Sequence, residues 1–181
     1  ASPMALKDGY IIDLIKWENP YDPSEPYSAK NHLGLASLSL TTSNLPADMA
    51  VLTTHGVAFS GPVTIDRPVA NSQMISFSDP DGTLIELVQL GNVPTGGTPN
   101  NSGETYITGA LRTNANCSNY EVSRSFYEML GFAIEGEVVE GEMGSPPHVR
   151  AATMTLPLGH SLNLTKWEDP YDSEAPYAAL N

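Results

Sequence analysis

Basic residues are scarce in this chain of 181 residues. It has 8 lysines and arginines but 21 acidic residues, which gives a net charge of -13. A chain this acidic lacks the positive surface that phosphate groups require, so nucleic acids and anionic membranes are excluded as expected partners. The charge is favourable for a cationic ligand and for solubility.

Cysteine and long apolar runs are scarce as well. Cys117 is the single cysteine, which excludes an intrachain disulfide and a metal site made of several cysteines. The sequence has no run of about 18 apolar residues that could span a membrane, and no secretion signal is visible at its start. We therefore expect a cytoplasmic protein. Its hydrophobic content of 40% is sufficient for a folded core.

The sequence does contain an internal repeat. The phrase "KWENPYD" begins at Lys16, and "KWEDPYD" begins at Lys166. When residues 1–31 are aligned with residues 151–181, 15 of the 31 positions are identical without a gap. This indicates a repeat with a period of 150 residues, of which the chain contains one full period and a short overlap.

Between the repeated ends, the first half of the chain predicts a strand, a helix and three further strands. Residues 33–42 alternate apolar and small polar side chains, as a half-buried strand does. Ser43-Asn44 predicts the cap of a helix that is entered through Pro46 and ends at about Thr54. The three strands are expected at 57–65 (interrupted at Gly61-Pro62), 72–80 and 83–90.

The second half predicts the same order of elements after a linker rich in glycine, proline and asparagine. Its first strand is expected at 105–113 and its helix at 119–132. Val122, Phe126 and Leu130 fall on one apolar face of this helix, which is typical of a helix packed on a core. The later strands are expected at 133–141, 148–156 and 161–167.

Residues 1–17 predict an isolated β-hairpin that turns at Lys7-Asp8-Gly9. Such a hairpin is marginally stable alone, so we expect it to dock on a neighbouring repeat or on a second chain, most simply in a homodimer. The predicted organisation is a partial module (1–17), a connector (18–32), a βαβββ module (33–91), a linker (92–103), a second βαβββ module (104–168) and a connector (169–181).

Two phrases in the sequence resemble a known superfamily. "FSDPDGTLIEL" (77–87) is similar to the last hairpin, and "SRSFYEMLGF" (123–132) to the helix, of modules in vicinal-oxygen-chelate proteins. These include glyoxalase I, extradiol dioxygenases, methylmalonyl-CoA epimerase and bleomycin-resistance proteins. The resemblance implies an α+β fold in which paired βαβββ modules, with mixed sheets, curl into an open barrel around a small molecule.

The resemblance also implies a divalent metal held by residues of the first and fourth strands of each module. In this sequence these positions fall on Ser37 and Glu86 in the first module and on Asn163 in the second, where the first-strand position falls on Thr108 if residues 114–118 carry an insertion. Only Glu86 is a strong metal donor, so we expect this set not to bind a transition metal tightly. A divalent metal remains the alternative.

Glu86 is the candidate catalytic carboxylate. Inside a sheet it needs a partner, which could be an arginine such as Arg112 or Arg150, or a metal. Asp13 has in the N-terminal hairpin the position that Asn163 has in the last module. If a neighbouring copy contributes this hairpin, Asp13 could join Glu86 as a metal ligand.

The remaining candidates would contact a ligand. Trp17 and Trp167 each end a predicted strand, and they either pack between modules or form a wall on which a ligand stacks. Ser37, Thr108 and Asn163 are the polar ligand-binding candidates.

The sequence thus favours a glyoxalase-like protein that binds or converts a small molecule, with lyase, isomerase or dioxygenase chemistry open. The alternative is a metal-free protein of the bleomycin-resistance type that binds a drug.

Overall fold

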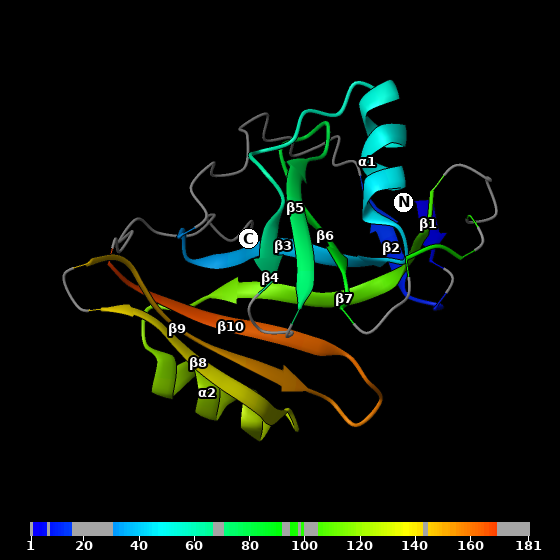
Figure 1. Ribbon diagram of the computed structural model, residues 1–181. Helices are drawn as coiled ribbons and strands as arrows, with labels where there is room; N and C mark the ends of the chain where they lie inside the picture. The colour runs from blue at the N-terminus through cyan, green and yellow to red at the C-terminus, as the bar shows by residue number, and fades with distance from the viewer. Residues whose placement is uncertain are drawn as a thin grey trace. The chain divides into compact units, whose positions relative to one another are not determined.

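The computed structural model describes residues 2–6, 8–15, 31–66, 71–91, 95–97, 99, 105–142 and 145–169 (Figure 1). Over these residues the chain forms ten strands and two helices. In chain order they are β1 (Ser2–Ala5), β2 (Ile11–Leu14), β3 (Gly34–Thr42), α1 (Leu45–Thr54), β4 (Thr64–Asp66), β5 (Ser72–Ser78), β6 (Leu84–Gln89), β7 (Ile107–Asn116), α2 (Tyr120–Met129), β8 (Ala133–Glu142), β9 (Ser145–Thr155) and β10 (Ser161–Asp169). The predicted β-α-β-β-β order therefore occurs twice after the N-terminal hairpin. None of the helices in these ranges is long and apolar enough to cross a membrane.

The chain divides into two compact units. Unit 1 comprises residues 1–26 and 39–111, and unit 2 comprises residues 27–38 and 112–181. The division falls within β3 and β7, so each unit contains part of both strands. The units do not coincide with the predicted modules. The module boundaries at 33–91 and 104–168 remain a prediction.

Each unit has its own strand order. In unit 1 the order is β4-β5-β6-β3-β7, and β1-β2 form a separate two-stranded sheet. In unit 2 the order is β3-β7-β10-β9-β8. β10 is parallel to β7 and antiparallel to β9, so the sheet is mixed, as expected for the α+β fold class.

Both helices begin and end in the same way. The side chain of the capping asparagine accepts a hydrogen bond from the backbone N–H three residues later, at 3.3 Å for Asn44 and 3.2 Å for Asn119. Each helix is followed by a glycine with positive φ, Gly56 at 82° and Gly131 at 98°. The first helix was predicted from its cap at Asn44, and the second from the apolar spacing within residues 119–132.

A buried carboxylate holds α1 in place. Asp48, in the first turn of the helix, is fully buried and accepts hydrogen bonds from the hydroxyl of Thr42 and from the backbone N–H of Tyr106 (2.6 Å). The backbone N–H of Leu45 donates to Oε1 of Gln89 at 2.8 Å. These bonds join the helix to the end of β3, to the residue before β7 and to β6.

Three hairpins in the chain share one turn geometry. A backbone N–H donates to the carbonyl four residues later from Leu6 to Tyr10 (2.8 Å), from Asp79 to Thr83 (2.9 Å) and from Leu156 to His160 (2.9 Å). The residue before the acceptor is always a glycine with positive φ, namely Gly9 (85°), Gly82 (89°) and Gly159 (89°). The N-terminal hairpin is therefore built like the last hairpin of each βαβββ module.

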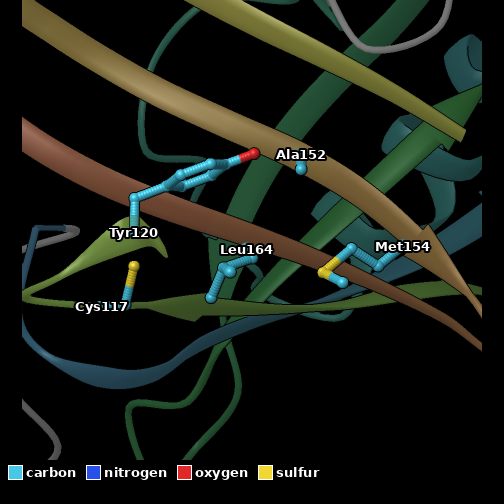
Figure 2. Close-up of a cluster of buried hydrophobic side chains, with 5 residues drawn as sticks. All are labelled: Cys117, Tyr120, Ala152, Met154 and Leu164. Carbon is cyan, nitrogen blue, oxygen red and sulfur yellow. The ribbon is translucent and has the colours of Figure 1, made fainter. Parts of the chain in front are cut away.

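The core of unit 2 lies between α2 and its sheet. Figure 2 shows its buried side chains, which are Cys117, Tyr120, Ala152, Met154 and Leu164. Tyr127, Phe132 and Ile134 pack against this cluster. Burial raises the pKa of the Cys117 thiol, so the single cysteine is a core residue rather than an activated nucleophile.

The face of α2 that packs on this core differs from the predicted one. Val122 is 65% exposed, and Phe126 and Leu130 are also exposed. The helix instead buries Tyr120 and part of Tyr127, about 100° around the helix axis. A tyrosine can bury its ring while its hydroxyl reaches a polar partner, so apolar spacing alone selected the wrong face.

That polar partner is Glu137. The Tyr120 hydroxyl donates to its carboxylate, which also pairs with Arg124 (3.4 Å) and Arg150 (3.6 Å). The guanidinium of Arg150 lies 4.0 Å from the centre of the Tyr120 ring. The hydrogen bond from Tyr120, followed by the nearby arginines, lowers the pKa of Glu137. Burial and the bond to Glu137 raise the pKa of Tyr120.

We predict that Asp48→Ala destabilises the protein by about 2–4 kcal/mol, because it leaves the Thr42 hydroxyl and the Tyr106 N–H without their acceptor. Urea unfolding measures the loss. Asp81→Ala makes the same change at an exposed turn position and should shift stability by less than about 0.5 kcal/mol. Equal effects of the two substitutions would contradict the role of Asp48.

A second prediction concerns pH. The folded-state pKa of Tyr120 is raised. Its contribution to the free energy of unfolding is therefore complete below the ordinary tyrosine pKa of about 10, and it declines as pH rises further. Because the pKa of Glu137 is lowered, its contribution is present above about pH 4 and declines as pH falls. Tyr120→Phe should weaken both slopes of unfolding free energy against pH. Tyr127→Phe, the matched control, should leave both slopes unchanged.

Candidate functional site

In unit 1, several polar side chains lie on the sheet face turned away from α1, which is called the polar face below. Thr42 and Gln89 bond to residues of α1, so they lie on the helix side of β3 and β6. Successive side chains of a strand point to opposite faces. Ser39 and Thr41 of β3 and Glu86 of β6 therefore lie on the other face.

Ser39 and Glu86 form a direct pair on this polar face. The Ser39 hydroxyl is fully buried and donates to Oε2 of Glu86 at 2.7 Å. Glu86 itself is half-buried, so its carboxylate is placed by the sheet and lies at the edge of solvent. A hydrogen bond to an ionised carboxylate is stronger than one between neutral groups, and it fixes the orientation of the side chain.

Thr41 extends the polar face toward β7. Its hydroxyl shares a hydrogen bond of 2.8 Å with the hydroxyl of Thr108, and it reaches the carbonyl of Gly109 at 3.2 Å. Thr108 is exposed. Two of the predicted site residues, Glu86 and Thr108, are thus joined through neighbouring residues of β3 rather than by a direct contact.

In unit 2, the corresponding face carries amide side chains. Leu162 and Leu164 of β10 are buried, and Leu164 belongs to the core beneath α2, so Asn163 lies on the opposite face. Asn163 of β10 is in register with Asn114 of β7 across a parallel pair of strands. Asn114 is buried and donates to the hydroxyl of Ser37 at 2.7 Å. Asn114 therefore lies between two of the predicted site residues.

A second amide fixes Trp167. Asn116 is buried and donates to the carbonyl of His32 at 2.7 Å, and its own oxygen accepts from the indole N–H of Trp167 at 3.1 Å. The indole is half-buried. Trp167 is thus held on the polar face of unit 2, whereas its repeat counterpart Trp17 lies outside the described residues.

Asn163 has an unused acceptor. Its amide nitrogen donates weakly to the hydroxyl of Thr165 at 3.4 Å. Its oxygen, Oδ1, is buried and has no hydrogen-bond partner among the residues that the structure describes. A buried acceptor left unsatisfied costs about 1–3 kcal/mol, and a ligand that donates a hydrogen bond would remove this cost.

Ser39 and Glu86 in unit 1, and Asn114 and Asn163 in unit 2, are called the two polar centres. They occupy equivalent places in the two βαβββ modules. Ser39 and Asn114 each lie five residues before the asparagine that caps the following helix. Glu86 and Asn163 each lie four residues after the turn glycine of the last hairpin. Glu86 and Asn163 were predicted from the sequence as site residues, whereas Ser39 and Asn114 were not.

The miss has a structural cause. Thr108 was assigned on the assumption of an insertion at 114–118, whereas in the structure β7 continues to Asn116 and the helix cap follows at Asn119. Counting back from the two caps with no insertion aligns Ser37 with Arg112 and Ser39 with Asn114, and it leaves Thr108 outside the set. The Ser39 hydroxyl is a partner of Glu86 that was not predicted.

Two further candidates lie elsewhere. Asp13 is exposed on β2, in the separate two-stranded sheet, at the position equivalent to Asn163 and Glu86. Arg150 is not a partner of Glu86, since its guanidinium pairs with Glu121 (2.6 Å) and Glu137.

The residues present do not fit a transition metal. In the described parts of the chain, no three His, Cys, Asp or Glu side chains lie close enough to hold an ion. The two centres supply one carboxylate, one hydroxyl and two neutral amides, and neutral oxygens compensate poorly for dehydration of a divalent ion.

Comparison with known proteins shows similarity in structure only. No family model matches the chain, and no curated protein sequence matches it. Glyoxalase I from Zea mays aligns with 77% of this chain at 16% identity and a TM-score of 0.54. A substituted form of that enzyme aligns with 79% at 15% identity and a TM-score of 0.56.

The chain covers 44% of the Zea mays protein and 47% of its substituted form, so it spans less than half of their length. A variant of methylmalonyl-CoA epimerase from Streptomyces coelicolor aligns with 77% of this chain and 98% of its own, at 13% identity and a TM-score of 0.48, which is too low to support an argument. At these identities the likeness concerns the fold alone. The chain has the vicinal-oxygen-chelate fold that its sequence resembles.

Proposed function

We propose that this chain binds a small polar molecule on the polar face of unit 1, through hydrogen bonds and the carboxylate of Glu86 rather than through a transition metal. The observation that carries the proposal is the pair of Ser39 and Glu86, in which a buried hydroxyl orients a half-buried carboxylate. Asn114 and Asn163 have the equivalent positions in unit 2.

The chemistry of these groups indicates the ligand. Glu86 is an acceptor, and Oδ1 of Asn163 is a buried acceptor without a partner among the described residues. Both centres therefore favour a molecule that donates hydrogen bonds. With a net charge of -13, the chain attracts cations over a distance of about one Debye length, so a small amine or guanidine is the preferred class.

A glyoxalase-type reaction is the second candidate, and the likeness in fold to glyoxalase I is the observation that favours it. In that case Glu86 is the group that accepts and returns a proton, since it is the carboxylate of the polar face. The donor set counts against a metal-dependent version of this chemistry.

Metal analysis tests whether a metal centre forms at Glu86. We predict that protein purified without chelator contains Mn, Fe, Zn and Ni far below one atom per chain, and that Glu86→Ala does not change these amounts. Elemental analysis measures both. One equivalent of a transition metal that disappears in Glu86→Ala would show that a metal centre forms and would favour the second candidate.

Ligand binding tests the proposal directly. In a thermal-shift screen of small primary amines and guanidines, we expect at least one compound to raise the melting temperature of the wild-type chain. Calorimetry should then show a Kd that is weaker by roughly 10- to 100-fold in Glu86→Gln, the loss expected for one charge-assisted hydrogen bond.

Glu135→Gln provides the matched control, because it makes the same change at an exposed position of β8. It should leave the Kd unchanged. If Glu86→Gln and Glu135→Gln bind the compound equally well, Glu86 does not contact the ligand and the proposed site is wrong.

A further inference from the structure

The N-terminal hairpin repeats the last hairpin of unit 2 in its register. In β1–β2, Ser2 pairs with Leu14 and Met4 with Ile12. Adding the repeat period of 150 residues to each number gives the pairs observed in β9–β10, where position 152 pairs with 164 and 154 with 162. Together with the shared turn, this makes β1–β2 a second copy of the same structural element.

The two copies have different surroundings. In β9–β10, Met154, Leu162 and Leu164 are 0%, 6% and 1% exposed. In β1–β2 the equivalent side chains form the hairpin face, defined as Met4, Ile12 and Leu14. Met4 is 52% and Leu14 is 54% exposed, and Ile12 is half-buried. The same apolar pattern is thus covered in one copy and open in the other.

The covering elements of the buried copy are known. In unit 2, β7 pairs with one edge of the hairpin, β8 pairs with the other edge, and α2 lies over the apolar face. All three elements belong to residues 105–150. In contrast, β1–β2 form a sheet of two strands, which is marginally stable in water.

The turn of the N-terminal hairpin is anchored by a contact that leaves the hairpin face open. Oδ2 of Asp8 accepts from the backbone N–H of Ala110 at 2.9 Å. A Cβ at Gly109 would lie 2.1 Å from this oxygen, so β7 admits the carboxylate because position 109 is glycine. Position 158, equivalent to Asp8, is an almost fully exposed leucine, so the anchor is particular to the first hairpin.

We propose that the hairpin face is a docking surface for a strand–helix–strand segment of the 105–150 type, supplied by a tandem copy of the 150-residue repeat. Such a segment would give β1–β2 the edge strands and the helix that β9–β10 have. A tandem copy is favoured over a second separate chain, because the 105–150 segment of this chain already covers its own hairpin. The inference does not depend on the proposed ligand.

An extended chain tests this proposal. Residues 105–150 are placed before residue 1 of the full chain, and the junction is natural because Ala1 is the repeat equivalent of Ala151. Hydrogen exchange of the backbone amides of residues 2–6 and 8–15 is then compared with the unextended chain. We expect exchange to slow by at least about 100-fold, as for amides that move from an open edge into a cooperative unit.

Substitutions identify the surface. Leu14→Asp should abolish the added protection in the extended chain, and it should change little in the unextended chain, where Leu14 is exposed. Leu158→Asp is the matched control, because that leucine is exposed in the turn of the covered copy. The amides of β9–β10 serve as an internal reference and should exchange at the same rate in both chains.

Two results would overturn the proposal. The first is unchanged exchange of residues 2–15 in an extended chain whose β9–β10 amides are protected as before. The second is a dimer of the unextended chain, detected by light scattering, that Leu14→Asp dissociates while the extension gives no protection. In that case a second chain covers the hairpin face, and the tandem copy does not.

Discussion

The buried carboxylate of Asp48 is the interaction on which the polar face of unit 1 depends. It accepts from Thr42 at the end of β3 and from Tyr106 just before β7, while it sits in the first turn of α1. Three segments that are distant in sequence are therefore tied at one point. Because strand side chains alternate, fixing Thr42 against the helix also places Ser39 and Thr41 on the opposite face.

That alternation explains why the site is polar without being a metal centre. The helix-facing positions need apolar side chains for a core, and the other face is free to carry hydroxyls, amides and one carboxylate. Neutral donors can orient a ligand through hydrogen bonds at about 1 kcal/mol each, but they supply little of the charge that a transition metal requires. The chemistry thus follows from which polar residues occupy the second face, and the fold does not determine them.

The sequence predicted well what depends on local backbone chemistry. Asn44 located the start of α1 and Gly9 located the turn of the first hairpin, because caps and positive φ values constrain few residue types. Prediction from the sequence failed where tertiary packing determines which face of an element is buried. The choice of Tyr120 over Val122 as the buried side of α2 depends on Glu137, which lies on another element. Asn114 was not predicted, because the first-strand position of the second module was assigned to Thr108.

The three equivalent hairpins separate the requirements of folding from those of chemistry. Each keeps the turn glycine and the same backbone bond, because any other arrangement would change the strand register. Four residues after that glycine, however, the hairpins carry Asp13, Glu86 and Asn163. Glu86 and Asn163 lie on the sheet face turned away from the helix of their module, where such an exchange alters charge and hydrogen bonding. The repeat therefore preserves a scaffold in which one position can differ in charge from copy to copy.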